Sequence, residues 1–198
     1  MEHFYENIQG WNGQLVNLYE SVVPELPDNA RVVEIGAWAG RSTAHLSVLL
    51  INSGKPFELN VVDHWQGSTE PYYQDPEVKQ RDIYNEFVDN MAPVIDHLTI
   101  HRMSSTEAAA QFADSSLDWV IIDDDHNYEF AKASVQAWLP KVKPGGFISG
   151  DDHHVWWRGV IDSCQEQFGS DYWIITEKGE MIHAADSPEE YGAWFKQV

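Results

Sequence analysis

Short apolar runs alternate with helix-like segments along this chain, and no other feature of the sequence constrains the fold as strongly. The runs are rich in Val, Ile and Leu, and those predicted to be buried strands are Arg31–Ile35, Leu59–Asp63, Leu98–His101, Trp119–Asp123 and Gly146–Asp151. The segments predicted to be helices between and after them are Ser42–Asn52, Val78–Asn90, Ser105–Phe112 and Tyr128–Leu139. This alternation predicts an α/β fold with a doubly wound, mostly parallel sheet.

Three segments lie outside this alternation. Residues 1–28 contain several aromatic and Leu side chains, and we expect one or two helices there that pack on the domain as a lid or extension. Residues 64–76 are rich in Gly, Pro, Ser and aromatic residues and follow a strand, so we expect a loop on the substrate side of the sheet. Tyr172–Ile175 and Met181–Ala184 predict an antiparallel closing hairpin. No repeat or linker interrupts the chain, so residues 1–198 are predicted to form a single domain.

The charge of the chain limits its partners. Asp and Glu number 32 against 12 Lys and Arg, which gives a formal net charge of −20. Because nucleic acids and anionic lipids are bound through Lys and Arg, we expect neither nucleic acid nor a membrane as a partner. The single cysteine, Cys164, leaves no internal disulfide and no cysteine cluster for zinc. With no secretory signal and no long apolar run, we expect a cytoplasmic protein that binds a small molecule, and its aromatic N-terminus is a candidate homodimer contact.

A glycine-containing turn after the first strand is the candidate cofactor site. Gly36 and Gly40 allow a ligand to approach backbone N–H groups at the start of a helix. The G-x-x-x-G spacing lacks the middle glycine of a dinucleotide cradle, and Glu34 is an acid where a pyrophosphate would be repelled. Asp63 ends the second strand at about the interval at which an acid accepts ribose hydroxyls. An acidic, glycine-lined site for an adenosine favours S-adenosylmethionine, whose sulfonium and ammonium groups are positive.

Acidic residues at the ends of two later strands predict a metal site. Asp123 ends the fourth strand, and Asp151 and Asp152 end the fifth. These strands are neighbours in a doubly wound sheet, so the carboxylates are expected on the order of 5 Å apart. Like charges this close repel unless a cation neutralises them, and Mg²⁺ or a similar hard divalent ion prefers oxygen ligands.

Several segments, in order, resemble motifs of class I S-adenosylmethionine-dependent methyltransferases. Residues 34–42 (EIGAWAGRS) look like motif I, and residues 63–67 (DHWQG) resemble the D-x-W-x-G of one branch of that class. Residues 122–129 (IDDDHNYE) resemble that branch's I-D-G-D-H-S-Y-E, and residues 139–146 (LPKVKPGG) with Asp151–Asp152 resemble its L-P-x-L-K-P-G-G and D-D. One departure is Asp124, where the branch usually has glycine; a positive φ there would strain an aspartate.

The resemblance implies a Rossmann-like sheet of seven strands and a metal-dependent O-methyltransferase similar to the macrocin-type sugar enzymes and the catechol enzymes. It implies that Gly36, Trp38 and Ser42 surround the methionine end of the cofactor, with Asp63 on the ribose. Met103 and Ser104 would lie near the adenine. The expected cofactor-binding residues further include Glu34, Gly40 and Asp123, and the expected metal ligands are Asp123, Asp151 and Asp152.

The reaction expected from this resemblance needs a base to deprotonate a hydroxyl group of the acceptor. Two candidates follow the fourth strand: Asp125, which matches the proposed base of the sugar enzymes, and His126, which ranks slightly higher because its ordinary pKa lies near neutrality. Two other functions stay open, an NAD-dependent oxidoreductase and a non-catalytic module that binds S-adenosylmethionine.

Overall fold

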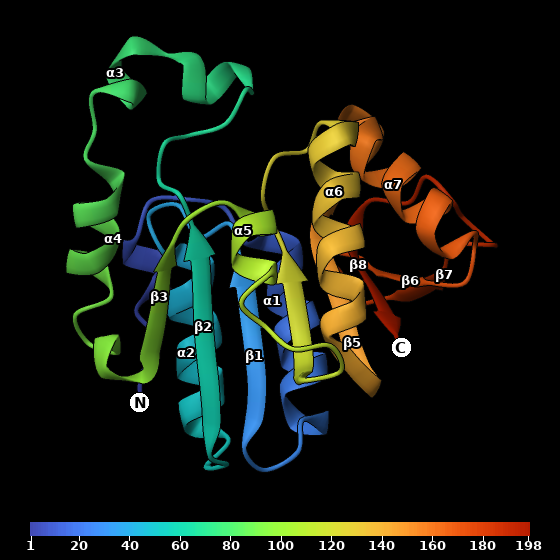
Figure 1. The fold of residues 1–198 in the computed structure, drawn as a ribbon, viewed down its shortest axis with the longest axis horizontal. Helices are drawn as coiled ribbons and strands as arrows, with labels where there is room; N and C mark the ends of the chain where they lie inside the picture. Colours follow the sequence, from blue (N-terminus) through green and yellow to red (C-terminus); the bar gives the residue numbers. More distant parts are fainter.

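Eight strands form one sheet in the computed structural model, which describes residues 1–198, and their order is β3-β2-β1-β4-β5-β8-β6-β7 (Figure 1). The parallel strands are β1 (Ala30–Ile35), β2 (Phe57–Asp63), β3 (Leu98–Arg102), β4 (Leu117–Ile122) and β5 (Val142–His153). The antiparallel strands are β6 (Trp173–Ile175), β7 (Met181–His183) and β8 (Gly192–Gln197). The predicted Rossmann-like α/β fold with its closing hairpin is confirmed, except that the sheet has eight strands instead of seven.

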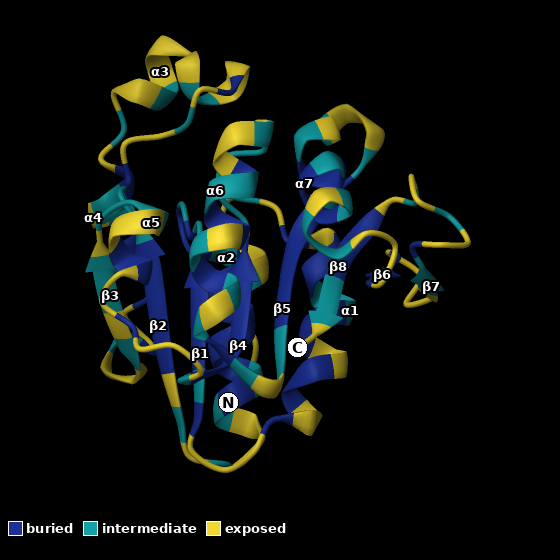
Figure 2. Cartoon of the chain, turned by 45° about the vertical axis from the view of Figure 1, so that its right-hand side comes forward, coloured by how far each residue is buried: buried dark blue, intermediate teal, exposed yellow.

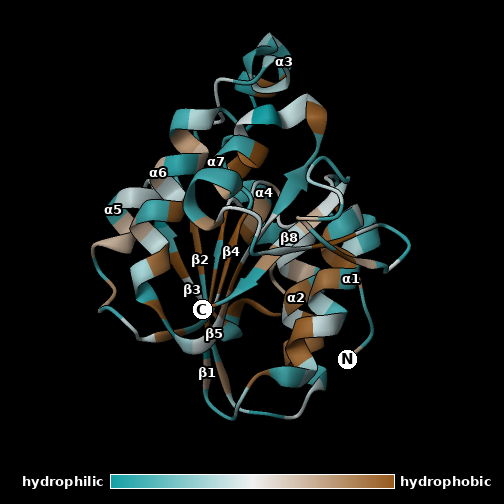
Figure 3. Cartoon of the chain, turned by 90° about the vertical axis from the view of Figure 1, so that its right-hand side faces the viewer, coloured by the Kyte–Doolittle hydropathy of each residue, from teal (hydrophilic) through white to brown (hydrophobic).

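Helices cover both faces of this sheet (Figure 3). The helices are α1 (Gly13–Val22), α2 (Arg41–Asn52), α3 (Pro76–Lys79), α4 (Ile83–Asn90), α5 (Ser105–Ala109), α6 (Tyr128–Trp138) and α7 (Arg158–Phe168), and α3 stands beyond the carboxyl ends of the strands (Figure 1). Short 3-10 turns are η1 (Tyr5–Asn7), η2 (Val23–Glu25), η3 (Pro71–Gln74), η4 (Ile95–His97), η5 (Leu139–Lys141) and η6 (Val155–Trp157). None of the helices combines the length and the apolar character that a bilayer crossing requires.

Alternation along the strands builds a separate core on each face. In β1, Val32 packs with α1, α2 and α4, whereas Val33 and Ile35 pack with α5, α6 and α7 on the other side. This is the two-residue period of a strand, in which successive side chains point to opposite faces. The central strands are therefore buried along most of their length (Figure 2). Glu34 lies on the same face as Val32 and has no access to solvent.

The predicted boundaries differ from the structure where the local sequence pattern is weakest. The helix expected over Val78–Asn90 is interrupted, because Asp82 caps a new helix, α4, by accepting a hydrogen bond from Asn85 N at 3.3 Å. The final strand, β8, was not predicted from the sequence. It lies between β5 and the hairpin, so the hairpin does not join the parallel strands directly.

Candidate functional site

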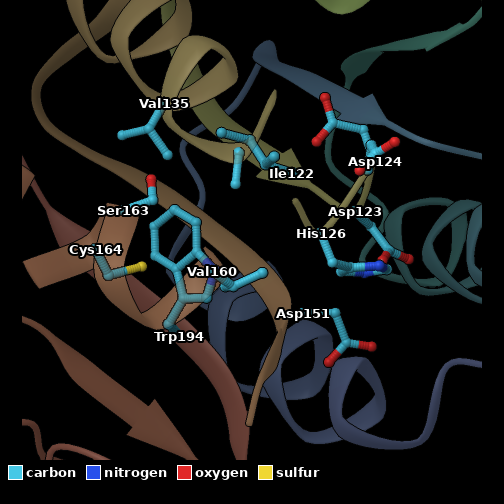
Figure 4. Close-up of a pocket in the computed structure, with 12 residues that line it drawn as sticks. Ile122, Asp123, Asp124, His126, Val135, Asp151, Val160, Ser163, Cys164 and Trp194 are labelled. Atoms are coloured by element: carbon cyan, nitrogen blue, oxygen red, sulfur yellow. The ribbon is translucent and has the colours of Figure 1, made fainter. Parts of the chain in front are cut away.

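The carboxyl ends of β4 and β5 bring acidic side chains and a histidine together. Asp123 directly follows β4, and β5, which pairs with β4, ends with Asp151, Asp152 and His153. The ligand atoms of Asp123, His126 and Asp152 all lie within 4.8 Å of one another. His126 Nε2 lies 2.7 Å from Asp152 Oδ2 and 3.9 Å from Asp123 Oδ1. We call Asp123, His126, Asp151 and Asp152 the acidic cluster, and Figure 4 shows the first three of these residues.

His126 contacts the acids of this cluster. Burial alone would lower the pKa of His126, but the nearby carboxylates of Asp123, Asp152 and Glu70 outweigh it and raise the pKa. His126 Nε2 lies between two of the carboxylates that the sequence predicted as metal ligands.

Asp151 belongs to the acidic cluster but is not among the three residues whose ligand atoms lie within 4.8 Å of one another. Its side chain is buried, and its Oδ1 has no hydrogen-bond partner. Burial and the nearby charges of Asp123 and Asp152 raise its pKa well above the usual range. A buried carboxylate oxygen without a partner is costly, and a cation next to it would remove that cost. The donors available from Asp123, Asp151 and Asp152 are all oxygens, which fits a hard divalent ion.

Asp125, the other candidate base, points toward residues 64–76. Its Oδ2 accepts hydrogen bonds from Thr69 N at 3.2 Å and Thr69 Oγ1 at 2.9 Å, and its Oδ1 accepts one from Asn127 N at 2.9 Å. Burial would raise the pKa of Asp125, but these bonds outweigh it and lower the pKa. A carboxylate stabilised in its charged form is a weak base, which argues against this role.

Glu70 belongs to the site, although the sequence analysis did not single it out. Its Oε1 accepts a hydrogen bond from His126 N at 3.0 Å and pairs with His126 Nδ1. It is only 7% exposed, whereas its neighbours Pro71 and Tyr72 are exposed. The only available signal was its place in the loop expected to border the substrate.

The glycine turn lies next to the acidic cluster. Gly36 has φ +85°, and a Cβ built on it would lie 1.8 Å from the carbonyl oxygen of Asp123, so only glycine lets β1 and β4 end this close together. Gly40, at φ +95°, begins α2 and packs against Met91 and Phe87. The turn also holds a non-glycine residue in the left-handed region, Trp38 at φ +43°. Such backbone conformations persist only where the surrounding contacts enforce them.

Asp63 holds this turn in place. Its Oδ2 accepts hydrogen bonds from Ala37 N at 3.0 Å and Trp38 N at 2.9 Å, and its Oδ1 accepts one from Trp65 N at 2.6 Å. The end of β2 is thereby tied to the candidate cofactor turn. The ribose contact expected for Asp63 stays a prediction, and it requires this carboxylate to share its oxygens with backbone donors.

Glu34 is buried between β1 and the helices α1 and α2. It is 0% exposed and accepts hydrogen bonds from Tyr19 Oη at 3.2 Å and Thr43 Oγ1 at 2.5 Å. Burial raises its pKa to about 7, a shift that the bond from Thr43 limits. In this conformation its carboxylate ties α1 and α2 to β1, and the expected contact of Glu34 with the cofactor stays a prediction. Ser42, at the start of α2, is also buried, at 5% exposure.

A groove beyond the end of β3 matches the expected adenine end of the site. Its volume is about 630 Å³. It is lined by His64, Gln66, Arg102, Met103, Ser104, Glu107 and Gln111. Met103 and Ser104, which were expected near the adenine, line this groove, and their contact with the adenine stays a prediction. Ser104 also caps α5 in a reciprocal pair with Glu107, which fixes the backbone at the groove wall.

A second, much smaller cavity lies behind the acidic cluster. Its volume is about 20 Å³, enough for one water molecule. Asp124 lines it and accepts a hydrogen bond from Ser134 Oγ. Asp124 does not adopt a positive φ, so the backbone strain considered for an aspartate at this position does not arise. The left-handed residue of the region is instead Asp152, at φ +56°.

Aromatic side chains border the site on two sides. Trp157 stacks on His126, with ring centroids 4.7 Å apart. Trp11 stacks on Trp38 at 5.3 Å, so the N-terminal segment reaches the glycine turn. His153 is not part of the acidic cluster, because its ring bonds to Tyr172 Oη and to the carbonyl of Glu190.

The free energy of unfolding is expected to fall as the pH rises through 7, because burial raises the pKa of both Glu34 and Asp124 to about 7. The folded protein then binds more protons than the unfolded chain between the ordinary carboxyl pKa and 7, so this stability is present at acidic pH and lost above it. Urea denaturation at pH 5.5 and pH 8 should show that Glu34→Gln removes about 2 kcal/mol of this pH dependence. The exposed control Glu20→Gln should leave it intact, and an unchanged slope in Glu34→Gln would contradict the raised pKa.

Comparisons with known proteins address the identity of this fold and site. Residues 33–153, more than half of the chain, match a family model described as a methyltransferase domain. The uncharacterized protein y4gI of Sinorhizobium fredii is 27% identical over 125 residues. That match covers 63% of this chain but 13% of the relative, so this chain spans a small part of that protein's length.

Solved structures of methyltransferases share the fold. The O-methyltransferase NovP has a TM-score of 0.61 at 16% identity, covering 94% of this chain and 78% of NovP. CalS11, a TDP-rhamnose 3′-O-methyltransferase of calicheamicin biosynthesis, has a TM-score of 0.59 at 15% identity, with coverage of 94% and 78%. Identities this low show a common fold and no more. Because the family model spans most of the sheet and both candidate sites, the chain belongs to the methyltransferase domain family, as the sequence motifs predicted.

Proposed function

We propose that this protein is a metal-assisted O-methyltransferase that uses S-adenosylmethionine and acts on the hydroxyl group of a small molecule, a sugar or an aryl compound. The observation that supports this most directly is the placement of Asp123, Asp151 and Asp152 at the ends of two neighbouring strands, beside the glycine turn. NovP and CalS11, which share the fold, are O-methyltransferases, and CalS11 acts on a sugar nucleotide. They support oxygen as the accepting atom and a sugar as one class of acceptor.

S-adenosylmethionine supplies a methyl group on a positively charged sulfur, and transfer forms a carbon–oxygen bond as the carbon–sulfur bond breaks. Since the leaving group is already activated, the protein mainly has to align the acceptor and remove its proton. Gly36, Trp38 and Ser42 would hold the methionine end, and the groove at Met103 and Ser104 would hold the adenine. The many acidic side chains favour this cation over an anionic ligand.

A divalent ion such as Mg²⁺, when bound by Asp123, Asp151 and Asp152, would lower the pKa of a nearby acceptor hydroxyl. Asp123 and Asp152 also lie close to His126 Nε2 in this structure, so the ion and the imidazole would share these carboxylates. Between the two candidate bases, His126 is better placed, because its Nε2 faces the acids. Asp125 instead bonds Thr69 and Asn127 with both its oxygens.

Calorimetry followed by a methyl-transfer assay tests the proposal. The protein is titrated with S-adenosylmethionine and with NAD⁺, and turnover is then measured with a panel of sugars and phenols, with Mg²⁺ and with a chelator. We expect binding of S-adenosylmethionine and turnover that the chelator suppresses. Preference for NAD⁺ would indicate an oxidoreductase, and binding of S-adenosylmethionine without turnover of any acceptor would indicate a binding module.

Asp63→Ala is expected to weaken S-adenosylmethionine binding on the order of 10-fold or more, because it removes the expected ribose acceptor and releases the N–H groups of Ala37 and Trp38. Metal affinity should change little, since Asp63 lies outside the acidic cluster. Calorimetry with each ligand measures both. Asp75→Ala is the matched control, because Asp75 also caps a backbone N–H, that of Glu77, but in the exposed helix α3. Unchanged cofactor affinity in Asp63→Ala would refute the ribose role.

A further inference from the structure

Residues 64–76 cross from the end of β2 to the end of β4. Figure 1 shows this segment leaving β2 and passing above the carboxyl ends of the strands toward α3. Because β1 lies between β2 and β4 in the sheet, the segment passes over the glycine turn that follows β1. The loop therefore lies over the place where the cofactor turn and the acidic cluster meet.

Two consecutive residues attach this segment to the loop after β4. Thr69 Oγ1 donates to Asp125 Oδ2 at 2.9 Å and accepts from Asn127 Nδ2 at 2.7 Å. Glu70 Oε1 accepts from His126 N at 3.0 Å and pairs with Nδ1 of the same ring. These contacts join residues more than fifty positions apart, so they form only when the segment is folded over the site.

The burial of Glu70 is unusual for its surroundings. Every residue from Pro71 to Gln80 is exposed or half-buried, yet Glu70 is 7% exposed and its carboxylate points at His126. Burying a carboxylate is costly unless it is paired, and the partner here is the histidine of the acidic cluster. In a loop that only covered the surface, an acidic side chain at this position would be expected to remain in solvent.

Glu70 and Trp157 together determine how the imidazole lies. Glu70 contacts Nδ1 at one edge of the ring, and Trp157 stacks on its face with an interplanar angle of 30°. With the edge and the face both held, Nε2 is left facing Asp123 and Asp152. The orientation of Nε2 thus depends on a residue contributed by the segment after β2.

We propose that Glu70 is a positioning residue: it orients His126 toward Asp123 and Asp152, so that the acidic cluster is fully assembled only while residues 64–76 lie closed over it. Its effect on turnover rests on the proposed methyltransferase function, whereas its effect on loop closure does not. Closure after the acceptor enters would then bring His126 to the hydroxyl group and exclude water in the same movement.

The experiment compares Glu70→Ala and Glu70→Gln with the wild-type protein. Glu77→Gln is the matched control, because Glu77 is an exposed acid just beyond the same segment and its side chain makes no contact with the site. Hydrogen exchange followed by mass spectrometry reports opening of residues 64–75 and 125–127. Calorimetry gives the affinity for S-adenosylmethionine, and steady-state kinetics give kcat and KM for the acceptor that the panel identifies.

We expect Glu70→Ala to exchange both segments on the order of 10-fold faster and to lower kcat on the order of 100-fold, as a misplacement of about 1 Å does. Cofactor affinity should stay within about twofold, which a general loss of structure would not allow. Glu70→Gln, which keeps an acceptor oxygen for His126 N, should lie between wild type and Glu70→Ala. Glu77→Gln should match the wild type in every measurement.

The outcomes separate the two proposals. Faster exchange with unchanged kcat would show that Glu70 only closes the loop, and unchanged exchange with a lower kcat would show that closure is independent of it; either result overturns the inference. If the wild-type protein transfers no methyl group to any acceptor, the proposed function fails. Unchanged exchange in Glu70→Ala would then reject the closure contact as well, whereas faster exchange would support it.

Discussion

Asp152→Asn is expected to lower methyl transfer on the order of 100- to 1000-fold and to abolish its stimulation by Mg²⁺. The substitution keeps the shape of the side chain, and asparagine tolerates the left-handed backbone of Asp152 at φ +56°. It removes one of the negative charges that hold His126 and that would hold a metal ion. Turnover with and without Mg²⁺, together with calorimetric titration of the metal, measures the effect.

The fold should survive this substitution, because it relieves repulsion between neighbouring carboxylates. Burial raises the pKa of Asp123 and Asp151, and the charge of Asp152 adds to the rise in both. The relief of this repulsion offsets the lost contact with His126 Nε2, so the thermal midpoint of Asp152→Asn should be close to that of the wild type. Asp186→Asn, which removes an exposed acid far along the chain, is the control and should retain full activity. Retained Mg²⁺ stimulation in Asp152→Asn would contradict the proposed metal site.

Gly36→Ala is expected to destabilise the protein by more than about 4 kcal/mol, or to prevent folding altogether. The added Cβ would lie 1.8 Å from the carbonyl oxygen of Asp123 and 2.4 Å from its carbonyl carbon. Both are backbone atoms and cannot move aside as a flexible side chain could. The surrounding bonds leave no freedom either, since Gly36 N donates to Val62 O at 2.9 Å and Asp123 N donates to Ile35 O at 2.7 Å.

Gly54→Ala is the matched control for this clash. Gly54 also has a positive φ, +70°, but a Cβ there would meet nothing within 4 Å. It should therefore cost only the backbone strain, about 1–2 kcal/mol. Denaturant unfolding of both variants measures the difference, and equal losses would show that the close approach of β1 and β4 is not what requires glycine at position 36.

The strand and helix pattern of the parallel half of the fold could be predicted because it is local. The runs around Val33, Val61 and Val120 are continuous and apolar, as strands buried on both faces must be. The break between α3 and α4 and the position of β8 were missed. The first depends on a capping aspartate, and the second on the pairing of Gly192–Gln197 with both β5 and β6, which no local pattern shows.

The candidate site was predicted in part, for a related reason. That Asp123 and Asp152 lie close together follows from the ends of neighbouring parallel strands, which a sequence can reveal. Three other features depend on the direction in which an acidic side chain points. Glu34 is buried against Tyr19, Asp63 accepts hydrogen bonds from the backbone of the glycine turn, and Asp125 points toward Thr69. The sequence placed each of these acids near the site but could not show which way it points.

The sequence by itself therefore determined the class of fold, the family and the edge of the sheet at which the acids gather. These features follow from local patterns of consecutive residues, which predict the strands, the helices and their order along the chain. Only the tertiary structure decided that His126 stands between Asp123 and Asp152 and that Glu70 reaches across from another loop to orient it. The physical reason is that these contacts join residues far apart in the chain. These contacts form because of burial and charge pairing in the folded protein, and a local sequence pattern shows neither of these.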